Sequence, residues 1–175
     1  MKSKPKIIET NRLILKELTL LDEEDFISII SNEEVSLTYM VPSFKNNQEK
    51  INLFNRFMEL SASASRFVYG IFLNDKLIGI INDVERKNNE IELGYAILPK
   101  FKNNGYATEV LSNSITILFD MGYKTIKTGA FKENIASIKV MEKCNMIRTN
   151  VIDKINYNGI EHECVNYMIS NNIGD

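Results

Sequence analysis

The chain contains stretches in which apolar and polar residues alternate and stretches in which apolar residues recur every third or fourth position. Alternation is typical of half-buried strands, and the longer period is typical of amphipathic helices. Alternation predicts strands within residues 8–18, 66–73, 76–84, 90–98, 124–130, 147–156 and 160–170. The helical period predicts helices over residues 22–30, 47–60, 106–121 and 134–143. The stretch around Tyr39–Pro42 is predicted to be a loop.

Turn residues support these boundaries. Gly122 suits the left-handed conformation that ends a helix, and Asn145 can adopt the same conformation after the last helix. Asn158-Gly159 is expected to turn between the last two strands. The helix between Leu98 and Lys124 is a crossover, and a crossover joins parallel strands. We therefore predict an α+β fold with a mixed, mostly antiparallel sheet of about seven strands flanked by helices.

Composition narrows the classes of protein that remain. The 175 residues suggest one domain over residues 1–175, and the net charge of −2 lacks the basic surplus of a nucleic-acid binder. No apolar run approaches the roughly 18 residues of a membrane span, and the polar start does not resemble a signal peptide. We expect a cytoplasmic protein without a membrane or nucleic-acid partner. Two cysteines and one histidine are too few for a usual zinc site, so we expect no metal.

The stretch with the clearest chemical character is Gly94–Glu109, in which a strand breaks into a polar loop and a helix follows. Several backbone N–H groups at such a helix start lack partners, and together with the helix dipole they form an anion site. Lys102 adds positive charge, and Gly105 lets the backbone approach a ligand closely. On these residues alone, the stretch is either a phosphate site or a plain connection. It lacks the glycine pattern of a Walker or a Rossmann loop.

The same stretch resembles the GNAT family of acetyl-CoA-dependent N-acetyltransferases. Lys102-Asn-Asn-Gly-Tyr-Ala107 follows the order of that family's Gln/Arg-x-x-Gly-x-Gly/Ala motif. Asn134-Ile-Ala-Ser137 with Lys143 is similar to its second conserved helix, and Glu9-Thr-Asn-Arg-Leu-Ile-Leu-Lys16 is similar to the opening of its RimJ/RimL branch. Three such segments in the right order identify the chain as a member. Lys102, Asn103 and Asn145 depart from the residues that the family usually has there, which should weaken acyl-CoA binding at most.

The resemblance implies a sheet with one splayed parallel strand pair and acetyl-CoA as co-substrate. The loop would hold the pyrophosphate, and the pantetheine arm would run along the strand that ends at Leu98. It implies cofactor-binding residues at Ile97, Leu98, Lys102, Asn103, Asn104, Gly105, Tyr106, Ala107, Thr108, Asn134, Ser137 and Lys143. The acyl-CoA-binding core would cover about residues 66–146.

Two residues are expected to carry the chemistry. Deprotonating a lysine-like amine at neutral pH costs about 4.6 kcal/mol, and an α-amine costs only about 1.1 kcal/mol. Glu92 is the candidate base, because strand alternation places it on the face of Gly94 and Ala96. It could equally be a cross-strand charge partner. By resemblance, Ser137 would supply a proton to the leaving thiolate, or it could be only a cap or a cofactor contact.

The helices of residues 22–60 are expected to cover the acceptor end. Tyr39, Met40, Phe44 and Phe54 are the candidate substrate-binding residues, with core packing as the alternative. The predicted activity is acetyl transfer to a primary amine, foremost the N-terminus of a protein such as a ribosomal protein. The alternatives are a small amine (a polyamine, an amino acid or an aminoglycoside) or a catalytically idle acyl-CoA-binding module. The open sheet has edges to cover, so a homodimer through the C-terminal strands or a sheet edge is expected.

Overall fold

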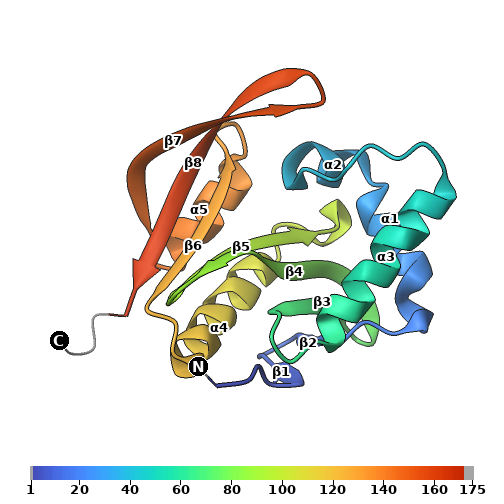
Figure 1. Cartoon of the computed structure of the whole chain (residues 1–175), viewed down its shortest axis with the longest axis horizontal. Coiled ribbons are helices and arrows are strands. Elements are labelled where there is room, and N and C mark those ends of the chain that lie inside the picture. The colour runs from blue at the N-terminus through green and yellow to red at the C-terminus, as the bar shows by residue number, and fades with distance from the viewer. Residues whose placement is uncertain (1, 172–175) are drawn as a thin grey trace.

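The computed structural model describes residues 2–171 and shows one twisted sheet with helices on both faces (Figure 1). Its strands are β1 Ile7–Glu9, β2 Ile14–Lys16, β3 Val68–Leu73, β4 Lys76–Lys87, β5 Glu90–Ile97, β6 Thr125–Phe131, β7 Ile147–Tyr157 and β8 Ile160–Ser170. Its α-helices are α1 Glu23–Ile30, α2 Glu33–Tyr39, α3 Asn47–Ala62, α4 Tyr106–Met121 and α5 Ile135–Lys143. Short 3₁₀ turns lie at Leu20–Asp22 and Pro99–Phe101.

The eight strands follow the order β1-β2-β3-β4-β5-β6-β8-β7. Neighbouring strands are antiparallel except β5 and β6, which are parallel and joined through α4. The structure therefore confirms the α+β fold, the mostly antiparallel sheet and the single crossover. Asn145 has a φ of 59°, so the left-handed residue expected after α5 is also present.

The N-terminal strand prediction is wrong in detail. Residues 8–18 do not form one strand, because a turn at Thr10 to Leu13 folds them into the short antiparallel pair β1 and β2. The backbone N–H of Thr10 donates to the Leu13 carbonyl at 2.9 Å, and the Thr10 hydroxyl contacts the same carbonyl at 3.0 Å. This hairpin accounts for the eighth strand of the sheet.

The stretch before Pro42 also differs from the prediction. Residues 33–39 form the helix α2, which begins at Asn32, whose side chain accepts from the Val35 N–H at 3.1 Å. It ends at Met40, which takes a left-handed φ of 55°. Val35 is its only buried residue, so the helix lacks the apolar stripe by which a helix is found in a sequence. Tyr39 consequently sits on a helix end rather than in a loop.

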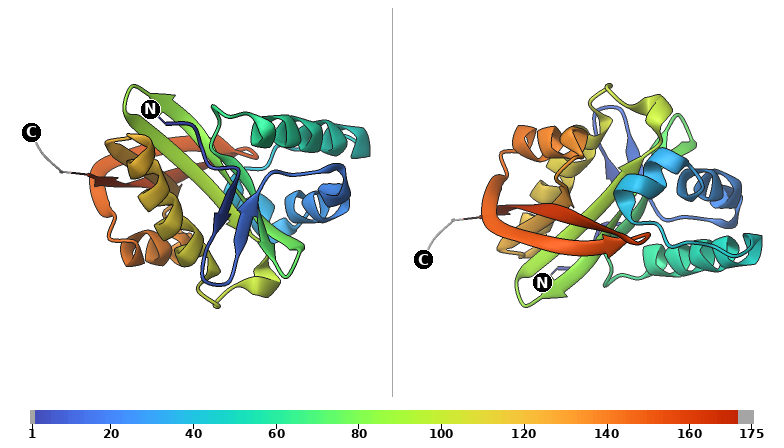
Figure 2. Two further views of the ribbon diagram at one scale, coloured as in Figure 1. Left: turned by 90° about the horizontal axis from the view of Figure 1, so that it is seen from below. Right: turned by 90° about the horizontal axis from the view of Figure 1, so that it is seen from above.

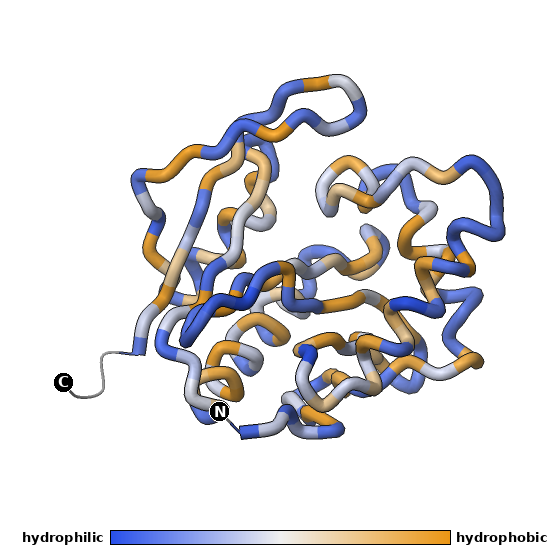
Figure 3. Tube along the Cα trace, in the orientation of Figure 1, coloured by the Kyte–Doolittle hydropathy of each residue, from blue (hydrophilic) through white to orange (hydrophobic). Residues whose placement is uncertain are grey.

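Two cores lie on opposite faces of the sheet (Figure 2). One packs α4 and α5 against the sheet around Leu111, Leu118 and Ile126. The other packs α1 and α3 around Phe26 and Phe54. Figure 3 shows the hydrophobic colour concentrated along α4 and the central strands, and a more mixed pattern in the β7–β8 ribbon. In the part of the chain that is described, no helix is long and apolar enough to cross a membrane.

The sheet opens between β5 and β6. Their registered pairs run from Glu90 and Thr125 to Leu93 and Thr128, after which the two strands part. A bulge lies on the neighbouring strand β4, between Asp83 and Glu85. The opening and the bulge meet at the middle of the molecule, where the candidate site lies.

Candidate active site

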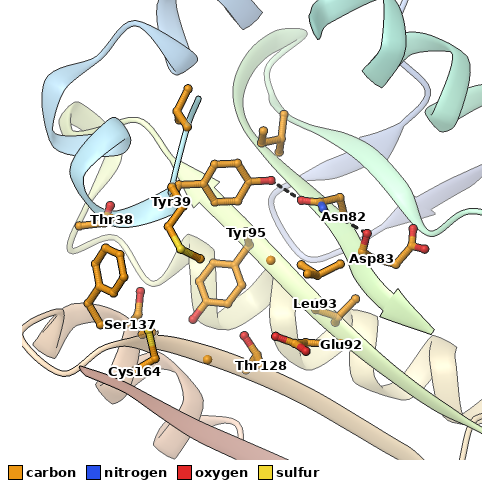
Figure 4. A pocket seen from close by; sticks show the side chains of 18 of the residues that line it. Thr38, Tyr39, Asn82, Asp83, Glu92, Leu93, Tyr95, Thr128, Ser137 and Cys164 are labelled. Atoms are coloured by element: carbon orange, nitrogen blue, oxygen red, sulfur yellow. Dashed lines mark hydrogen bonds between the residues drawn. The ribbon is translucent and has the colours of Figure 1, made fainter. Parts of the chain in front are cut away.

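A cavity of about 490 Å³ occupies the opening between β5 and β6 (Figure 4). Its floor comes from β4, β5 and β6, and its walls come from the end of α2, from α3, from the start of α5 and from the β7–β8 ribbon. Segments from the first and last thirds of the chain therefore meet around one space. Glu92, Tyr95 and Ser137 all line it.

Glu92 projects into this cavity from β5. Its neighbours across the strands are Glu85 on β4 and Lys127 on β6. Burial raises the pKa of the Glu92 carboxyl, Glu85 raises it further, and Lys127 opposes the shift. The bulge lies on β4 rather than β5, and Glu92 lines the cavity with Gly94. A half-buried carboxyl with a raised pKa, facing a cavity, has the character of a general base.

Tyr95 also lines the cavity, although it is not among the site residues expected from the sequence. Its hydroxyl points to the side of the cavity where Ser137 and Cys164 lie (Figure 4). Burial raises the pKa of the Tyr95 hydroxyl, and the adjacent Ser137 hydroxyl slightly opposes that shift. Within residues 2–171 no hydrogen bond of normal geometry reaches the Tyr95 oxygen. A buried, protonated and unpaired hydroxyl is available to donate to a bound group.

Sequence reasoning missed Tyr95 because strand alternation put it on the face opposite Glu92. The alternation persists, since Tyr95 packs on the face of Leu93 and Ala96 on the other face, but Tyr95 still lines the cavity because β6 has left β5 at this point. The signal that could have found Tyr95 is its place in the strand just before the polar loop.

The start of α5 forms the next wall. Asn134 caps this helix, because its side-chain oxygen accepts from the Ser137 N–H at 3.1 Å. The cap fixes both residues at the cavity, and it leaves the Asn134 amide nitrogen without a protein partner in the described chain. Lys143 lies exposed in the last turn of α5, which is outside the cavity lining.

The polar loop before α4 has the expected conformation. Asn103 has a φ of 62° and Gly105 a φ of 78°, so both adopt left-handed backbone. Asparagine tolerates this conformation better than most residues, which explains why Asn103 can stand where relatives have glycine. Within the described chain, the backbone N–H groups of residues 103–108, namely Asn103, Asn104, Gly105, Tyr106, Ala107 and Thr108, donate to no protein group. Unpaired N–H groups at a helix start favour an anion.

The loop is held from outside by the β1–β2 turn. The Arg12 guanidinium donates to the Asn104 carbonyl at 2.8 Å and contacts the Glu109 carboxylate at 2.7 Å. Thr10 donates to Glu109 at 2.6 Å, and the Arg12 side chain lies over the Tyr106 ring. Burial tends to raise the pKa of Glu109, but these hydrogen bonds from Thr10 and Arg12 lower it overall. We call these contacts of Thr10 and Arg12 the loop clamp.

Two expected cofactor positions have other contacts in this structure. The Lys102 ammonium pairs with Glu34 of α2. The Leu98 N–H donates to the Ile78 carbonyl at 2.9 Å, so it faces β4. Because antiparallel pairing alternates, the polar backbone groups of Tyr95 and Ile97 face the other way, toward the gap left by β6. Of the pair Ile97 and Leu98, only Ile97 offers its backbone to the gap.

The acceptor side is lined by Tyr39 and Met40. The Tyr39 hydroxyl donates to the Asn82 side-chain oxygen across the cavity (Figure 4). A Cβ at Gly94 would lie 3.4 Å from the Tyr39 ring, so glycine leaves room for this crossing. The other two expected residues are elsewhere. Phe54 is fully buried in the core, and Phe44 packs against that core with Lys50 near its ring.

The β7–β8 ribbon reaches over the cavity and touches α2 and the segment that follows it. The Tyr157 hydroxyl lies 2.5 Å from the Ser36 carbonyl and 2.8 Å from the Val41 carbonyl. At the ribbon's tip, Ser43 and Asn158 are joined by a 3.2 Å hydrogen bond. These contacts form a roof over the acceptor side.

Neither thiol is set up as a nucleophile. Burial raises the pKa of the Cys144 thiol to about 11, and this thiol contacts the Thr108 carbonyl at 3.5 Å. Cys164 lines the cavity, but burial raises the pKa of its thiol as well. Both thiols are therefore neutral at ordinary pH.

Comparisons with known proteins agree with this geometry. Residues 12–147 match the sequence model of a protein family described as "Acetyltransferase (GNAT) domain". The chain is 30% identical over 169 residues to YoaA of Bacillus subtilis (strain 168), described as an uncharacterized N-acetyltransferase, with 93% of this chain and 96% of YoaA covered.

Solved structures show the same fold. A GNAT acetyltransferase from Bacillus anthracis superposes with a TM-score of 0.80 at 22% identity, covering 94% of this chain and 98% of that one. RimL, a ribosomal-protein α-N-acetyltransferase, superposes with a TM-score of 0.81 at 17% identity, covering 94% and 93%, and it has also been solved with coenzyme A. The family match over residues 12–147 and a relative that aligns with 93% of the chain at 30% identity, together with the splayed sheet, show that the chain belongs to the GNAT family of acetyltransferases.

Proposed function

We propose that this protein transfers an acetyl group from acetyl-CoA to the α-amine of a protein N-terminus. The observation that carries the proposal is the meeting of Glu92 with Tyr95 and Ser137 in one cavity at the opening of the sheet. The similarity to RimL supports the choice of acceptor.

The residues around the opening fit acetyl-CoA. The N–H groups of residues 103–108 suit its pyrophosphate, and the free backbone edge at Tyr95 and Ile97 suits its pantetheine amides. The amide nitrogen of Asn134 is also free for this arm. Acetyl-CoA supplies the activated thioester. Side chains of this chain would accept the proton of the amine and donate hydrogen bonds to the leaving sulfur.

Glu92 takes the amine proton in this mechanism. An α-amine is about half neutral near pH 8, so the base has less work for such an acceptor than for a lysine-like amine. The raised pKa of Glu92 brings its proton affinity closer to that of the amine, which makes the transfer less uphill. A carboxylate in a half-buried cavity also attracts the protonated amine before reaction.

Tyr95 and Ser137 act at the other end. The Tyr95 hydroxyl stays protonated because burial raises its pKa, so it can hold a proton beside the leaving sulfur. The Ser137 hydroxyl lies next to it and can relay or replace that hydrogen bond. The amine proton thus passes to Glu92, while the leaving thiolate is stabilised by hydrogen bonds from Tyr95 and Ser137, which keep their protons.

A small-molecule amine is the second candidate, and the roof formed by the ribbon favours it. The cavity volume of about 490 Å³ lies within the ~300–1,000 Å³ that is usual for small-ligand sites. The contacts of Tyr157 with Ser36 and Val41 close the side from which a folded protein would approach. An extended N-terminus could still thread beneath the roof.

An acceptor screen tests the proposal. Purified protein and acetyl-CoA are incubated with N-terminal peptides, polyamines, amino acids and aminoglycosides, and products are detected by the mass of one added acetyl group. We expect transfer to peptide α-amines, and selective transfer to small amines would favour the second candidate. Acetyl-CoA binding in calorimetry without transfer to any amine would instead identify an idle acyl-CoA-binding module.

A further inference from the structure

The walls of the cavity carry opposite charges at its two ends. The end formed by α3 and the residues before β3 carries Arg56 and Arg66. The end formed by β5 and β7 carries Glu92 and Asp153. An inference about the acceptor follows from this polarity, and it rests on the proposed function because it concerns the same site.

Arg56 is the free charge of the basic end. It is exposed, it lines the cavity, and within residues 2–171 it makes no ion pair or hydrogen bond. Glu59, one turn further along α3, does not pair with it. Leu53, Phe57 and Leu60 of the same helix line the cavity beside it, so a group bound by Arg56 would be partly shielded from water. Shielding strengthens a charged hydrogen bond.

Arg66 adds to the same end, although part of it is occupied. Its Nε donates to the buried Asp83 carboxylate at 2.7 Å, and Arg86 binds the same oxygen at 2.8 Å. The guanidinium groups of Arg66 and Arg86 therefore share one carboxylate, and with Arg56, which is unpaired within residues 2–171, a positive excess remains at this end. Arg66 keeps its Nη1 free of protein partners in the described chain.

The acidic end carries an excess of negative charge. The carboxylates of Glu85 and Asp153 both act on Glu92, and Lys127, which opposes them, is paired with Glu90. Between the two ends, Tyr39 donates its only proton to Asn82, whose own nitrogen donates to the Asp83 carbonyl at 3.2 Å. The Tyr39 oxygen can therefore only accept from a ligand, as suits an amine.

We propose that the acceptor carries, besides its amine, a negatively charged group that Arg56 binds while the amine lies at Glu92 and Tyr39. The group is a carboxylate or another oxyanion, since these match the guanidinium donors. It comes either from an acidic side chain close to a protein N-terminus or from the free carboxylate of a small amino acid. Polyamines and aminoglycosides are disfavoured, because their further ammonium groups would meet Arg56 and Arg66.

Matched acceptors test this proposal. N-terminal peptides with a single glutamate at the second, third or fourth position are each compared with the glutamine version, and aminocaproate is compared with its amide. In the parent protein we expect at least one of these pairs to show a preference for the acidic acceptor. Its kcat/KM should be about fivefold above that of the neutral acceptor, mainly because its KM is lower. A preference among peptides assigns the charge to a protein N-terminus, and a preference confined to aminocaproate assigns it to a small amino acid.

Arg56 is then replaced. Arg56→Ala should remove the preference, Arg56→Lys should keep part of it, and Arg56→Glu should favour a lysine peptide instead. Arg56 is exposed, so these variants should fold. Lys50→Ala is the matched control, because it removes a positive charge from the same helix outside the cavity lining. Arg66 is not replaced, since its loss would leave Asp83 buried with one partner fewer.

Binding separates the two proposals. Calorimetry of the same peptides in the presence of CoA needs no turnover. Charge-dependent binding without any acetyl transfer would refute the proposed function and keep this inference. Transfer or binding that is equal for both members of every pair, or a preference that survives in Arg56→Ala, would overturn the inference.

Discussion

The loop at the start of α4 and the acceptor side of the cavity are built in different ways. The loop is one continuous stretch, and its unpaired N–H groups follow from the left-handed turns at Asn103 and Gly105 and from the helix that begins next. The acceptor side is assembled from the end of α2, from α3, from β4 and β5 and from the β7–β8 ribbon. Distant parts of the chain touch it only from outside, through the loop clamp of Thr10 and Arg12 and through Glu34, which pairs with Lys102.

The two kinds of site differ in how easily substitutions change the ligand that they bind. A backbone site offers the same N–H groups with many side chains, so it suits a co-substrate shared by a whole family. A site assembled from side chains of distant segments changes with each substitution, so it suits an acceptor that differs between members. We therefore expect changes in the loop to affect acetyl-CoA and changes in the pocket walls to affect the acceptor.

The largest effect is expected for Gly105→Val, which attacks the loop. Gly105 has a φ of 78°, where a β-branched residue is strained, and a Cβ there would lie 3.5 Å from the Arg12 guanidinium of the loop clamp, so the loop and its N–H groups would have to shift. We expect acetyl-CoA binding to be undetectable by calorimetry.

The matched control is Gly159→Val in the β7–β8 turn. Gly159 has a φ of 80°, and a Cβ there would meet nothing within 4 Å. It carries a similar backbone strain far from the loop. Unchanged acetyl-CoA affinity in Gly105→Val, or an equal loss in Gly159→Val, would mean that the loop does not hold the co-substrate.

Glu92→Gln is expected to lower kcat at neutral pH by about 100-fold for a lysine-like amine, the scale on which a positioned base contributes, and by less for an α-amine, which loses its proton more easily. The parent kcat should rise with pH through the raised pKa of Glu92, and the variant should lose this limb while partly recovering at high pH. Acetyl-CoA affinity should stay unchanged. Glu90→Gln is the control on the same strand, and a pH–rate profile shared by Glu92→Gln and the parent would reject the base role.

Stability offers an independent view of Glu92. Its pKa is higher in the folded than in the unfolded state, so folding favours the protonated carboxyl. The favourable contribution is complete below the ordinary glutamate pKa and is lost as pH rises through the raised value. Glu92→Gln should therefore have a higher Tm than the parent at neutral pH, and the difference should shrink in acid. A lower Tm at neutral pH would show that the ionised carboxylate is structurally paired.

Tyr95→Phe should lower kcat about tenfold and leave the free energy of unfolding nearly unchanged. The hydroxyl has no hydrogen-bond partner to lose, so its removal costs no protein contact.

Ser137→Ala should lower kcat by more than about threefold. If Tyr95→Phe is fully active, hydrogen bonding to the leaving sulfur falls to Ser137 alone, and if Ser137→Ala is fully active, the serine is only a cofactor contact or a cavity wall.

The smallest effect is expected for Arg12→Ala in the loop clamp. Arg12 is 42% exposed, so its contacts with Glu109 are worth little in stability. The loop should become less ordered, and the KM for acetyl-CoA should rise about threefold while the KM for the acceptor stays constant. Lys154→Ala breaks a more exposed ion pair on the ribbon and should leave both KM values unchanged. A rise in the acceptor KM alone would contradict the separation of the two regions.

The predictable elements of the fold are those with strong local signals. The α4 helix has a long apolar stripe and a glycine end, and it was predicted at the observed residues. The missed helix α2 buries one residue, and the β1–β2 turn depends on Thr10, which looks like any strand threonine in sequence. Short elements stabilised by tertiary contacts leave little periodic trace.

The site shows the same division. The loop of residues 102–108, the cap at Asn134 and the position of Glu92 could be anticipated from motifs and alternation. Tyr95 was not anticipated, because alternation places it on the face opposite Glu92, and it lines the cavity only because β6 leaves β5 after Leu93. Phe54 looked like Tyr39 in sequence, yet one fills the core and the other crosses the cavity.

The sequence by itself determined the α+β order, the crossover at α4, the loop with its free N–H groups and the family to which the chain belongs. These depend on residues a few positions apart, through periodicity, caps and left-handed turns. The tertiary structure alone decided that α2 bears Tyr39, that Tyr157 roofs the cavity and that Arg56 faces the same space as Glu92. Those relations join segments far apart in the chain, and packing sets them because only the folded sheet brings these segments together.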